Sequence, residues 1–372
     1  MARPLLPARP PAESASPDDL LRLARIPFTK ALYRLRESAS IADLRAALDL
    51  LWRQIDDPAG VLRAAADEAD VTTFSKRRLR EALDQIATAY TLERARYYLD
   101  RLARAALEIR TGAINDIDLN RWKEYDDILT DSLWLFDRRD ASGAHHAGFW
   151  GNFVPQIPYQ LMRRYTRRGD LVIDPFAGSG TTLIEGRRLG RSTIGVELNP
   201  AVAEQARATL ASEPDRRHAL YALEVGDSAT FDWRATLDRY GYRSAQLAIL
   251  HPPYHDIIRF SEDPRDLANA PSVDAFLARL GAVVARVTEV LDPGRYLALV
   301  LGDKYANGEW IPLGFLGMQE VLRCGFTLKS IVVKNFEQTT GKRAQKELWR
   351  YRALVGGFYV FKHEYIFIFR KA

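Results

Sequence analysis

The sequence predicts an α/β fold in which a mostly parallel sheet of seven strands is covered by helices, preceded by an all-helical domain. From Leu171 onward, short β-rich runs alternate with helical stretches, whereas residues 18–130 show only helical periodicity. The 372 residues are enough for two or three units with their own cores. With 47% hydrophobic and 27% charged residues, the composition is that of a globular protein and excludes collagenous, coiled-coil and wholly disordered chains.

The first part of the chain is expected to contain a short lead and a helical domain. Residues 1–17 are proline-rich and lack a long apolar run, so we expect a disordered lead and no signal peptide. Residues 18–144 are expected to form the helical domain, with a role in target recognition or partner contact. Its apolar residues recur three and four positions apart, as in Leu44, Leu48, Leu51 and Ile55.

Residues 145–372 are expected to form the α/β domain. The seven expected strands are LVID (171–174), STIGVE (192–197), LYALEVGD (220–227), QLAILH (246–251), RYLALVLGD (295–303), LKSIVVK (328–334) and HEYIFIFR (363–370). The last two runs leave no room for a helix as regular as the others, so an antiparallel pair is expected to end the sheet. Ligands of such sheets bind beyond the carboxyl ends of the strands.

A glycine-rich turn directly follows the first expected strand. It reads Asp174, Pro175, Phe176, Ala177, Gly178, Ser179, Gly180, Thr181, Thr182. Such a turn lets a ligand approach the backbone, because Cβ atoms are absent and N–H groups point outward. A phosphate-binding loop would need a lysine, and a dinucleotide fingerprint would need Gly or Ala where Leu183 stands. The pattern therefore favours a ligand with an adenosine but no pyrophosphate, such as S-adenosyl-L-methionine.

Two acidic residues follow the next two expected strands. Glu197 lies at the end of the second strand and can accept hydrogen bonds from both ribose hydroxyls. Asp227 lies at the end of the third and can accept one from the adenine amino group. Taken alone, either residue would more often cap a helix, but their order after the glycine turn favours cofactor binding.

The fourth expected strand ends in His251, Pro252, Pro253 and Tyr254. Here the chain resembles the S-adenosylmethionine-dependent DNA amino-methyltransferases, which methylate N6 of adenine or N4 of cytosine. DPFAGSGTT resembles their cofactor loop, and HPPY resembles their catalytic tetrapeptide, usually Asp, Asn or Ser followed by Pro-Pro-Tyr or Pro-Pro-Phe. Residues 148–156, with Phe153, resemble the segment that closes over the methionine, and HEYIFIFRK resembles the last strand. The resemblance covers roughly residues 145–372 and implies a Rossmann-like class I methyltransferase domain.

The resemblance also implies roles for the tetrapeptide. An exocyclic amine is a poor nucleophile, and two acceptors on its hydrogens, the side chain of His251 and the carbonyl of Pro252, would activate it. The prolines fix the backbone, and Tyr254 offers a face on which a flipped base can stack. His251 departs from the usual Asp, Asn or Ser. Since only a neutral imidazole can accept, we expect activity to fall as His251 protonates, near or below its reference pKa of roughly 6.5.

Two further predictions concern the same site: a reserve acceptor and the absence of a metal. If His251 only ends the strand, Asp256 is the reserve acceptor. No metal is expected, because the prolines keep His251 and His255 off a shared helical face and no third ligand is nearby.

Charge points to a polyanionic partner. The chain carries +5 overall, and residues 323–372 hold 11 basic and 3 acidic side chains, a local +8. Lys342, Arg343 and Lys346, in the basic segment before the last strand, are expected to contact phosphates of double-stranded DNA. A surface loop without a partner is the alternative.

The expected function is site-specific methylation of DNA, with cytosine N4 favoured slightly over adenine N6 because a neutral acceptor resembles Ser more than Asp. One alternative is an RNA amino-methyltransferase of the tRNA guanine-N2 type, and another is a non-catalytic DNA-binding subunit. A companion restriction endonuclease is a candidate partner.

With one cysteine, Cys324, and no stretch of ~18 apolar residues, a cytoplasmic location without a membrane span is expected.

Overall fold

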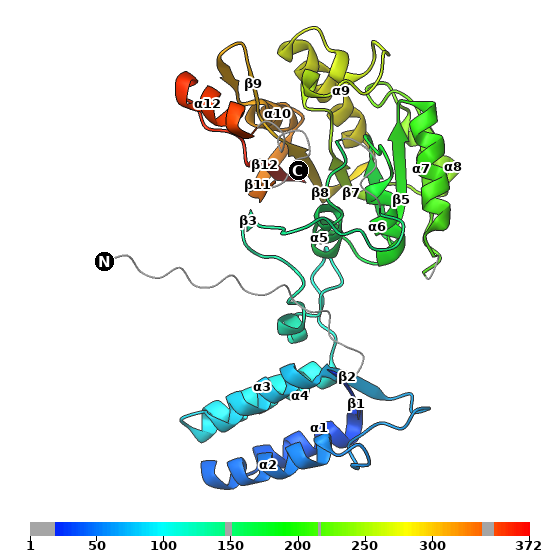
Figure 1. The fold of residues 1–372 in the computed structure, drawn as a ribbon. Helices are drawn as coiled ribbons and strands as arrows, with labels where there is room; N and C mark the ends of the chain where they lie inside the picture. Colours follow the sequence, from blue (N-terminus) through cyan, green and yellow to red (C-terminus); the bar gives the residue numbers. More distant parts are fainter. Residues whose placement is uncertain (1–18, 146–150, 215–216, 337–345) are drawn as a thin grey trace. The chain divides into compact units, whose positions relative to one another are not determined.

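The computed structural model describes residues 19–145, 151–214, 217–336 and 346–372, and these form two compact units (Figure 1). The first unit ends at Ile128, and the second begins at Leu129 and also includes Ile114–Asp116. The second unit therefore begins earlier in the chain than the expected residue 145. The expected lead, residues 1–17, lies outside the described residues.

The first unit is mainly helical, as predicted. It contains α1 (Arg25–Arg36), α2 (Ile41–Asp56), α3 (Lys76–Ala87), α4 (Leu92–Leu107) and the 3₁₀ turn η2 (Leu119–Glu124). Ser40 and Thr91 cap α2 and α4, since their hydroxyls accept the N–H of Asp43 and Arg94. The apolar positions that predicted α2, Leu44, Leu48, Leu51 and Ile55, are all buried.

The expectation that this unit is entirely helical was wrong. Strands β1 (Leu20–Ala24) and β2 (Val71–Ser75) pair antiparallel in it. Each strand has only five residues, and the partners lie about 50 positions apart, so no hairpin turn signals the pair in the sequence.

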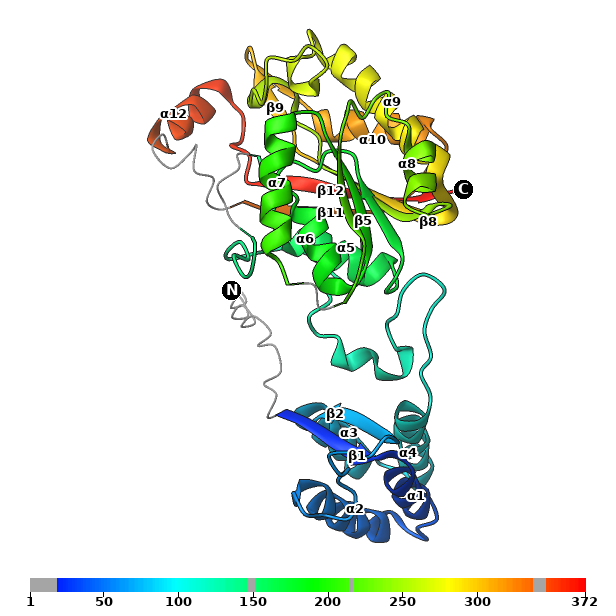
Figure 2. The same ribbon diagram turned by 90° about the vertical axis from the view of Figure 1, so that its right-hand side faces the viewer.

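The second unit is built on one large, mostly parallel sheet, which confirms the predicted α/β fold (Figure 2). In spatial order its strands are β3 (Leu133–Trp134), β11 (Phe326–Asn335), β12 (His363–Lys371), β8 (Leu291–Leu301), β7 (Ala245–Leu250), β4 (Leu171–Asp174), β5 (Ser192–Glu197) and β6 (Tyr221–Val225). Among the residues that the structure describes, the sheet has eight strands, so the predicted number of seven was wrong. The additional strand, β3, has two residues and is too short for a periodic pattern.

The predicted antiparallel end is confirmed, because β12 runs antiparallel to both β11 and β8. Strands β4 to β8 are parallel to one another, so their carboxyl ends share one edge of the sheet with the beginning of β12. This edge is where a ligand of a doubly wound sheet is expected.

Helices cover both faces of the sheet. The described helices of this unit are α5 (Gln156–Tyr165), α6 (Thr181–Leu189), α7 (Pro200–Ser212), α8 (Trp233–Arg239), α9 (Val273–Val290), α10 (Leu313–Arg323) and α12 (Lys346–Gly356), with short turns η3 (His255–Ile257) and η4 (Leu267–Asn269). Apolar residues of α8, α9 and α10 pack in one core, and those of α5, α6 and α7 pack in two further cores. A small hairpin, β9 (Lys304–Ala306) with β10 (Glu309–Ile311), follows β8. Within the described residues, no helix is long and apolar enough to span a bilayer.

Candidate active site

A cavity of about 1320 Å³ lies at the carboxyl edge of the sheet. Its walls come from segments that follow β4, β5, β6, β7, β8 and β11, and from the beginning of β12. This is larger than the ~300–1,000 Å³ of most small-ligand sites. The cavity is therefore large enough for a cofactor together with part of a second substrate.

The glycine-rich turn forms one wall of the cavity through Pro175, Phe176, Ala177 and Gly178. Gly178 has a φ of 51° and Gly180 a φ of 85°, a left-handed conformation that favours glycine. Gly195 on β5 is also required, because a Cβ there would lie 2.8 Å from the Cβ of Ala177. The turn thus folds closely onto the neighbouring strand and leaves its outer side to the cavity.

Glu197 joins the turn to the end of β5. Its Oε2 accepts the N–H of Gly178 at 3.0 Å and its Oε1 accepts the N–H of Asn199 at 2.8 Å. Burial raises the pKa of Glu197, and these backbone hydrogen bonds oppose the shift. Each carboxylate oxygen has more than one acceptor position, so Glu197 can hold the turn and still bind hydroxyl groups in the cavity.

Asp174 lies beneath the turn and does not line the cavity. Its Oδ1 accepts the N–H of Phe176 at 2.9 Å, and burial raises its pKa to about 6. Four other predicted cofactor residues, Ser179, Gly180, Thr181 and Thr182, are also outside the lining. The Thr181 hydroxyl donates to Oδ1 of Asn152 at 2.6 Å and so ties α6 to the segment that precedes α5.

The end of β6 supplies Asp227, which lines the cavity. Its Oδ1 accepts the N–H of Ala229 at 3.0 Å. Arg265 and Asp266 line the same cavity, although the sequence gave no motif that singled them out. Asp266 adds to the raised pKa of Glu197 through its negative charge.

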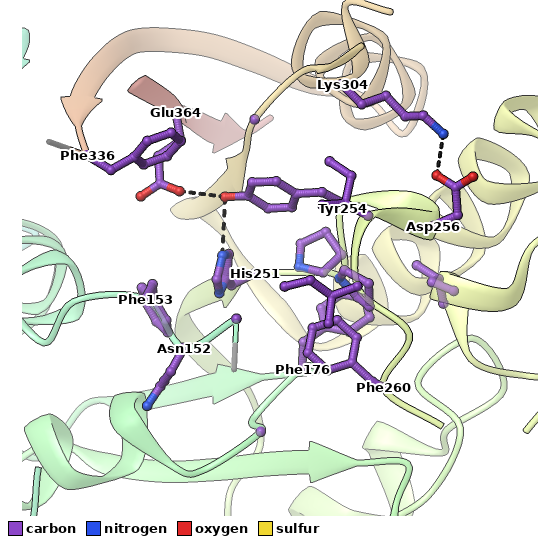
Figure 3. Close-up of a pocket in the computed structure, with 18 of the residues that line it drawn as sticks. Asn152, Phe153, Phe176, His251, Tyr254, Asp256, Phe260, Lys304, Phe336 and Glu364 are labelled. Carbon is purple, nitrogen blue, oxygen red and sulfur yellow. Dashed lines mark hydrogen bonds and ion pairs between the residues drawn. The ribbon is translucent and has the colours of Figure 1, made fainter. Parts of the chain in front are cut away.

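The tetrapeptide also lines the cavity, and Figure 3 shows His251 and Tyr254 there. His251 and Tyr254 are half-buried, and Nε2 of His251 lies 3.3 Å from the Tyr254 hydroxyl oxygen. That hydroxyl donates to Oε2 of Glu364 on β12 at 2.7 Å. Phe153, in the predicted closing segment, lies against His251 with ring centroids 4.8 Å apart. The structure therefore brings the predicted catalytic side chains and Phe153 together.

The surroundings of His251 favour its neutral form. Burial lowers the pKa of His251 to about 4, with Lys334 acting in the same direction and Glu364 against it. This agrees with the prediction that His251 protonates near or below its reference pKa of roughly 6.5, and the ring is uncharged at pH 7. Burial also raises the pKa of Tyr254 well above its usual value, and Glu364 reinforces that shift.

The reserve acceptor, Asp256, also lines the cavity, but it is ion-paired with Lys304. Burial opposes the effect, yet the hydrogen bond from Lys304 lowers the pKa of Asp256. Nζ of Lys304 also lies 2.9 Å from Nδ1 of His255. Asp256 and His255 are thus both engaged with the same buried ammonium group.

The predicted DNA-contact residues lie between β11 and β12 in the sequence. Lys342 and Arg343 lie outside the described residues, as does Trp150 of the closing segment, and Lys346 is described only as the first residue of α12. Trp349 of α12, and Phe358 and Phe361 in the stretch after that helix, nevertheless line the cavity. An aromatic-rich run between the last two strands was the available sequence signal for these residues.

The strand order and the position of the cavity fit the Rossmann-like fold of the methyltransferases that use S-adenosyl-L-methionine, which the sequence resemblance implied. The last strand of the open sheet runs antiparallel between two strands that are parallel to each other. The residues present fit that cofactor, because an open glycine turn and two carboxylates follow consecutive strands around one cavity.

Comparison with known proteins finds similarity to DNA methyltransferases. Residues 70–208 match the model of the N6/N4 methyltransferase family, described as DNA methylase. Type II methyltransferase M2.DpnII of Streptococcus pneumoniae is 34% identical over 100 residues, which are 26% of this chain and 34% of that protein. Type II methyltransferase M.HindIII of Haemophilus influenzae is 33% identical over 105 residues, 27% of this chain and 32% of that protein. These matches confirm the resemblance to the DNA amino-methyltransferase family.

The matches are partial. The aligned part of Type II methyltransferase M.MjaII of Methanocaldococcus jannaschii, 42% identical over 50 residues, is 9% of that protein and 13% of this chain. The aligned segments thus span about a third or less of these relatives. Among solved structures, TrmN from Thermus thermophilus aligns with a TM-score of 0.37 and 18% identity over 59% of this chain and 49% of that one. The family match ends at residue 208, before the tetrapeptide.

Proposed function

We propose that the protein transfers a methyl group from S-adenosyl-L-methionine to an exocyclic amino group of a base in DNA. The observation that carries this proposal is the position of His251 and Tyr254, which share one cavity with the glycine turn and Glu197. The family match supports DNA as the substrate.

The cofactor half of the cavity would hold the adenosyl group. Glu197 would accept hydrogen bonds from the ribose hydroxyls and Asp227 from the adenine amino group, with Gly178 lining the methionine side. Phe153, beside His251, would cover the methionine part. When bound, the cofactor supplies a sulfonium-activated methyl group.

The target half would activate the amine. The base is extruded from its helix, since an enzyme cannot reach the amino group inside the stack, and its face packs on Tyr254. His251 and the carbonyl of Pro252 accept the two amine hydrogens, so that the nitrogen lone pair is directed at the methyl carbon. The new N–C bond would form as the bond between the methyl carbon and the sulfonium sulfur breaks, leaving S-adenosylhomocysteine, and neutral His251 would accept the proton that the amine loses. Placement and charge stabilisation supply the rate.

Cytosine N4 is the target we favour over adenine N6, because an uncharged acceptor at residue 251 is closer to Ser than to Asp. The test is to incubate the protein with labelled cofactor and, in separate reactions, unmethylated double-stranded DNA or RNA, digest the nucleic acid and identify the modified nucleoside by mass. We expect N4-methylcytosine. N6-methyladenine would correct the target, whereas label found only in RNA, or DNA binding without transfer, would contradict the function.

DNA contacts outside the cavity are proposed for the basic segment before β12 and for the helical unit. Changing Lys342 and Arg343 together to Ala should weaken DNA binding. The slope of log Kd against log salt concentration should also decrease by about one to two, since about one unit is lost for each phosphate contact removed. The measurement is a salt titration of binding by fluorescence anisotropy. Arg239→Ala, at a residue that is ion-paired with Glu224 on β6 outside the cavity, is the control. An unchanged slope for the double variant would remove the segment from the interface.

A further inference from the structure

A chain of hydrogen bonds connects His251 to a buried ion pair. Lys334 on β11 and Glu364 on β12 face each other in register across the two strands, and Lys334 Nζ lies 3.1 Å from Glu364 Oε1. Both side chains are buried, with relative exposures of 6%. A carboxylate paired with an ammonium group acts as a hydrogen-bond acceptor. At the Glu364 end of this series of hydrogen bonds, the carboxylate therefore accepts and its neighbour must donate.

Tyr254 links Glu364 to His251 and fixes which of the two ring nitrogens of His251 carries a hydrogen. Its hydroxyl has a single hydrogen, which it donates to Glu364 Oε2 at 2.7 Å. The tyrosine oxygen can then only accept from His251, whose Nε2 lies 3.3 Å away. An imidazole nitrogen that donates must carry a hydrogen, and in the neutral ring the other nitrogen is then a bare acceptor.

We propose that Lys334, Glu364 and Tyr254 hold neutral His251 in the Nε2–H tautomer, so that Nδ1 is the acceptor for the target amine. This inference rests on the proposed function and names positioning residues for it. It accounts for a histidine where the family usually has Asp, Asn or Ser. An imidazole can replace those side chains only if its acceptor nitrogen is the one that meets the substrate.

The packing around the two rings supports the arrangement. A Cβ at Gly302, after β8, would lie 2.8 Å from Cε2 of Tyr254, so the absence of a side chain there lets the tyrosine ring reach Glu364. Phe153 packs on the His251 ring on another side. Figure 3 shows His251 placed between Phe153 and the Tyr254 hydroxyl. The charged groups that act on His251 are Glu364 and Lys334, from the two neighbouring strands.

The test reads the tautomer directly by NMR of protein labelled with ¹⁵N-histidine at pH 7. The chain has six histidines, and His251→Asn assigns the signal of residue 251. We expect the wild type to show the Nε2–H tautomer and Tyr254→Phe to show a mixture. Tyr254→Phe keeps the aromatic face for the base and removes only the hydroxyl link.

The same variants are then assayed for methyl transfer. We expect Tyr254→Phe to lower kcat by ~10–100-fold, by analogy with the loss of a group that orients a metal-bound histidine, with unchanged affinity for S-adenosylhomocysteine. Tyr365→Phe is the matched control, because Tyr365 makes an equivalent contact, 3.1 Å from Nε2 of His363, outside the cavity. It should change the His363 signal and leave the His251 signal and kcat as in the wild type.

Glu364→Gln is a second variant. A glutamine amide can either accept from or donate to Tyr254, so the direction of the chain is no longer fixed and a mixed His251 tautomer is expected. A wild-type Nδ1–H tautomer, or an unchanged tautomer and kcat in folded Tyr254→Phe, would overturn the inference. Absence of methyl transfer by the wild type would instead contradict the proposed function, and the NMR result would still decide the tautomer.

Discussion

The two halves of the cavity are built differently. In the cofactor half, acidic side chains are held by backbone N–H groups nearby in the sequence, as Glu197 is by Gly178 and Asn199. In the target half, Tyr254 is held by Glu364, 110 positions away, and Glu364 by Lys334 on another strand. The contacts of the cofactor half are made by backbone groups, so they do not depend on distant side chains. The contacts of the target half are made by side chains, and this is the half in which His251 departs from the Asp, Asn or Ser of the family that the chain resembles.

The comparison predicts that the halves can be disabled separately. The largest expected effect is that of His251→Ala, which removes an acceptor for the amine and should lower kcat by ~10²–10³-fold, the range seen when one oxyanion-hole donor is lost. Affinity for S-adenosylhomocysteine, measured by isothermal titration calorimetry, should not change. His251→Asn, which restores an acceptor oxygen, should recover part of the activity. Loss of cofactor binding in either variant would contradict the separation.

Glu197→Gln should have the opposite pattern. It replaces a charged acceptor of the cofactor half, and hydrogen bonds to charged groups contribute ~1.5–3 kcal/mol, so cofactor Kd should rise ~10–100-fold. With saturating cofactor, kcat should remain close to that of the wild type. Calorimetry and steady-state kinetics give the two values. A normal Kd with a reduced kcat would place Glu197 in the target half instead.

Gly302→Ala tests the packing of the target half. The added Cβ would lie 2.8 Å from Cε2 of Tyr254 and must displace that ring, since Gly302 has no space on this side. We expect kcat to fall about tenfold, with cofactor Kd unchanged, because orienting residues typically contribute 10–100-fold. Gly112→Ala is the control, since a Cβ there meets no atom within 4 Å. Equal activity of both variants would show that the Tyr254 ring can move without consequence.

The smallest effects should appear in the pH profile, where the halves should titrate separately. Because the pKa of His251 is lowered to about 4, its acceptor nitrogen is lost only as pH falls through that value, and kcat should stay constant from pH 8 to about 5. The pKa of Asp174 is raised to about 6, so its negative charge is lost below that pH, and cofactor KM should rise there. Measuring kcat and KM from pH 4 to 8 gives both curves. Asp174→Asn should abolish the KM change alone, and a kcat change near 6.5 would contradict the shift at His251.

These pKa shifts also affect stability. The folded pKa of His251 lies below the unfolded value of roughly 6.5, so folding becomes less favourable as pH falls from that value through about 4. Asp174 acts in the opposite direction, because its folded pKa lies above the unfolded one and its contribution is lost as pH rises through about 6. Circular dichroism at each pH therefore accompanies the kinetics, so that unfolding is not mistaken for titration.

The sequence alone predicted the fold class, seven of the eight strands of the main sheet and their antiparallel end. These features depend on local patterns: β-rich runs such as STIGVE form β5 over the predicted residues, and the glycines of the turn permit the positive φ values of Gly178 and Gly180. Strands β1, β2 and β3 were missed because their pairing is distant in the sequence, and β3 has only two residues. The boundary between the units, at residue 129, has no strong composition signal.

What the sequence by itself determined is the chemistry of each strand end: which residues follow β4, β5, β6 and β7, and in what order. Only the tertiary structure decided which distant groups meet them, because β12 returns between β8 and β11 and places Glu364 beside Tyr254 and Lys334. Local sequence specifies backbone conformation, whereas the environment of a titratable ring depends on strands brought together by the whole sheet. The lowered pKa of His251 and its bonding partners therefore could not be obtained from the motif alone.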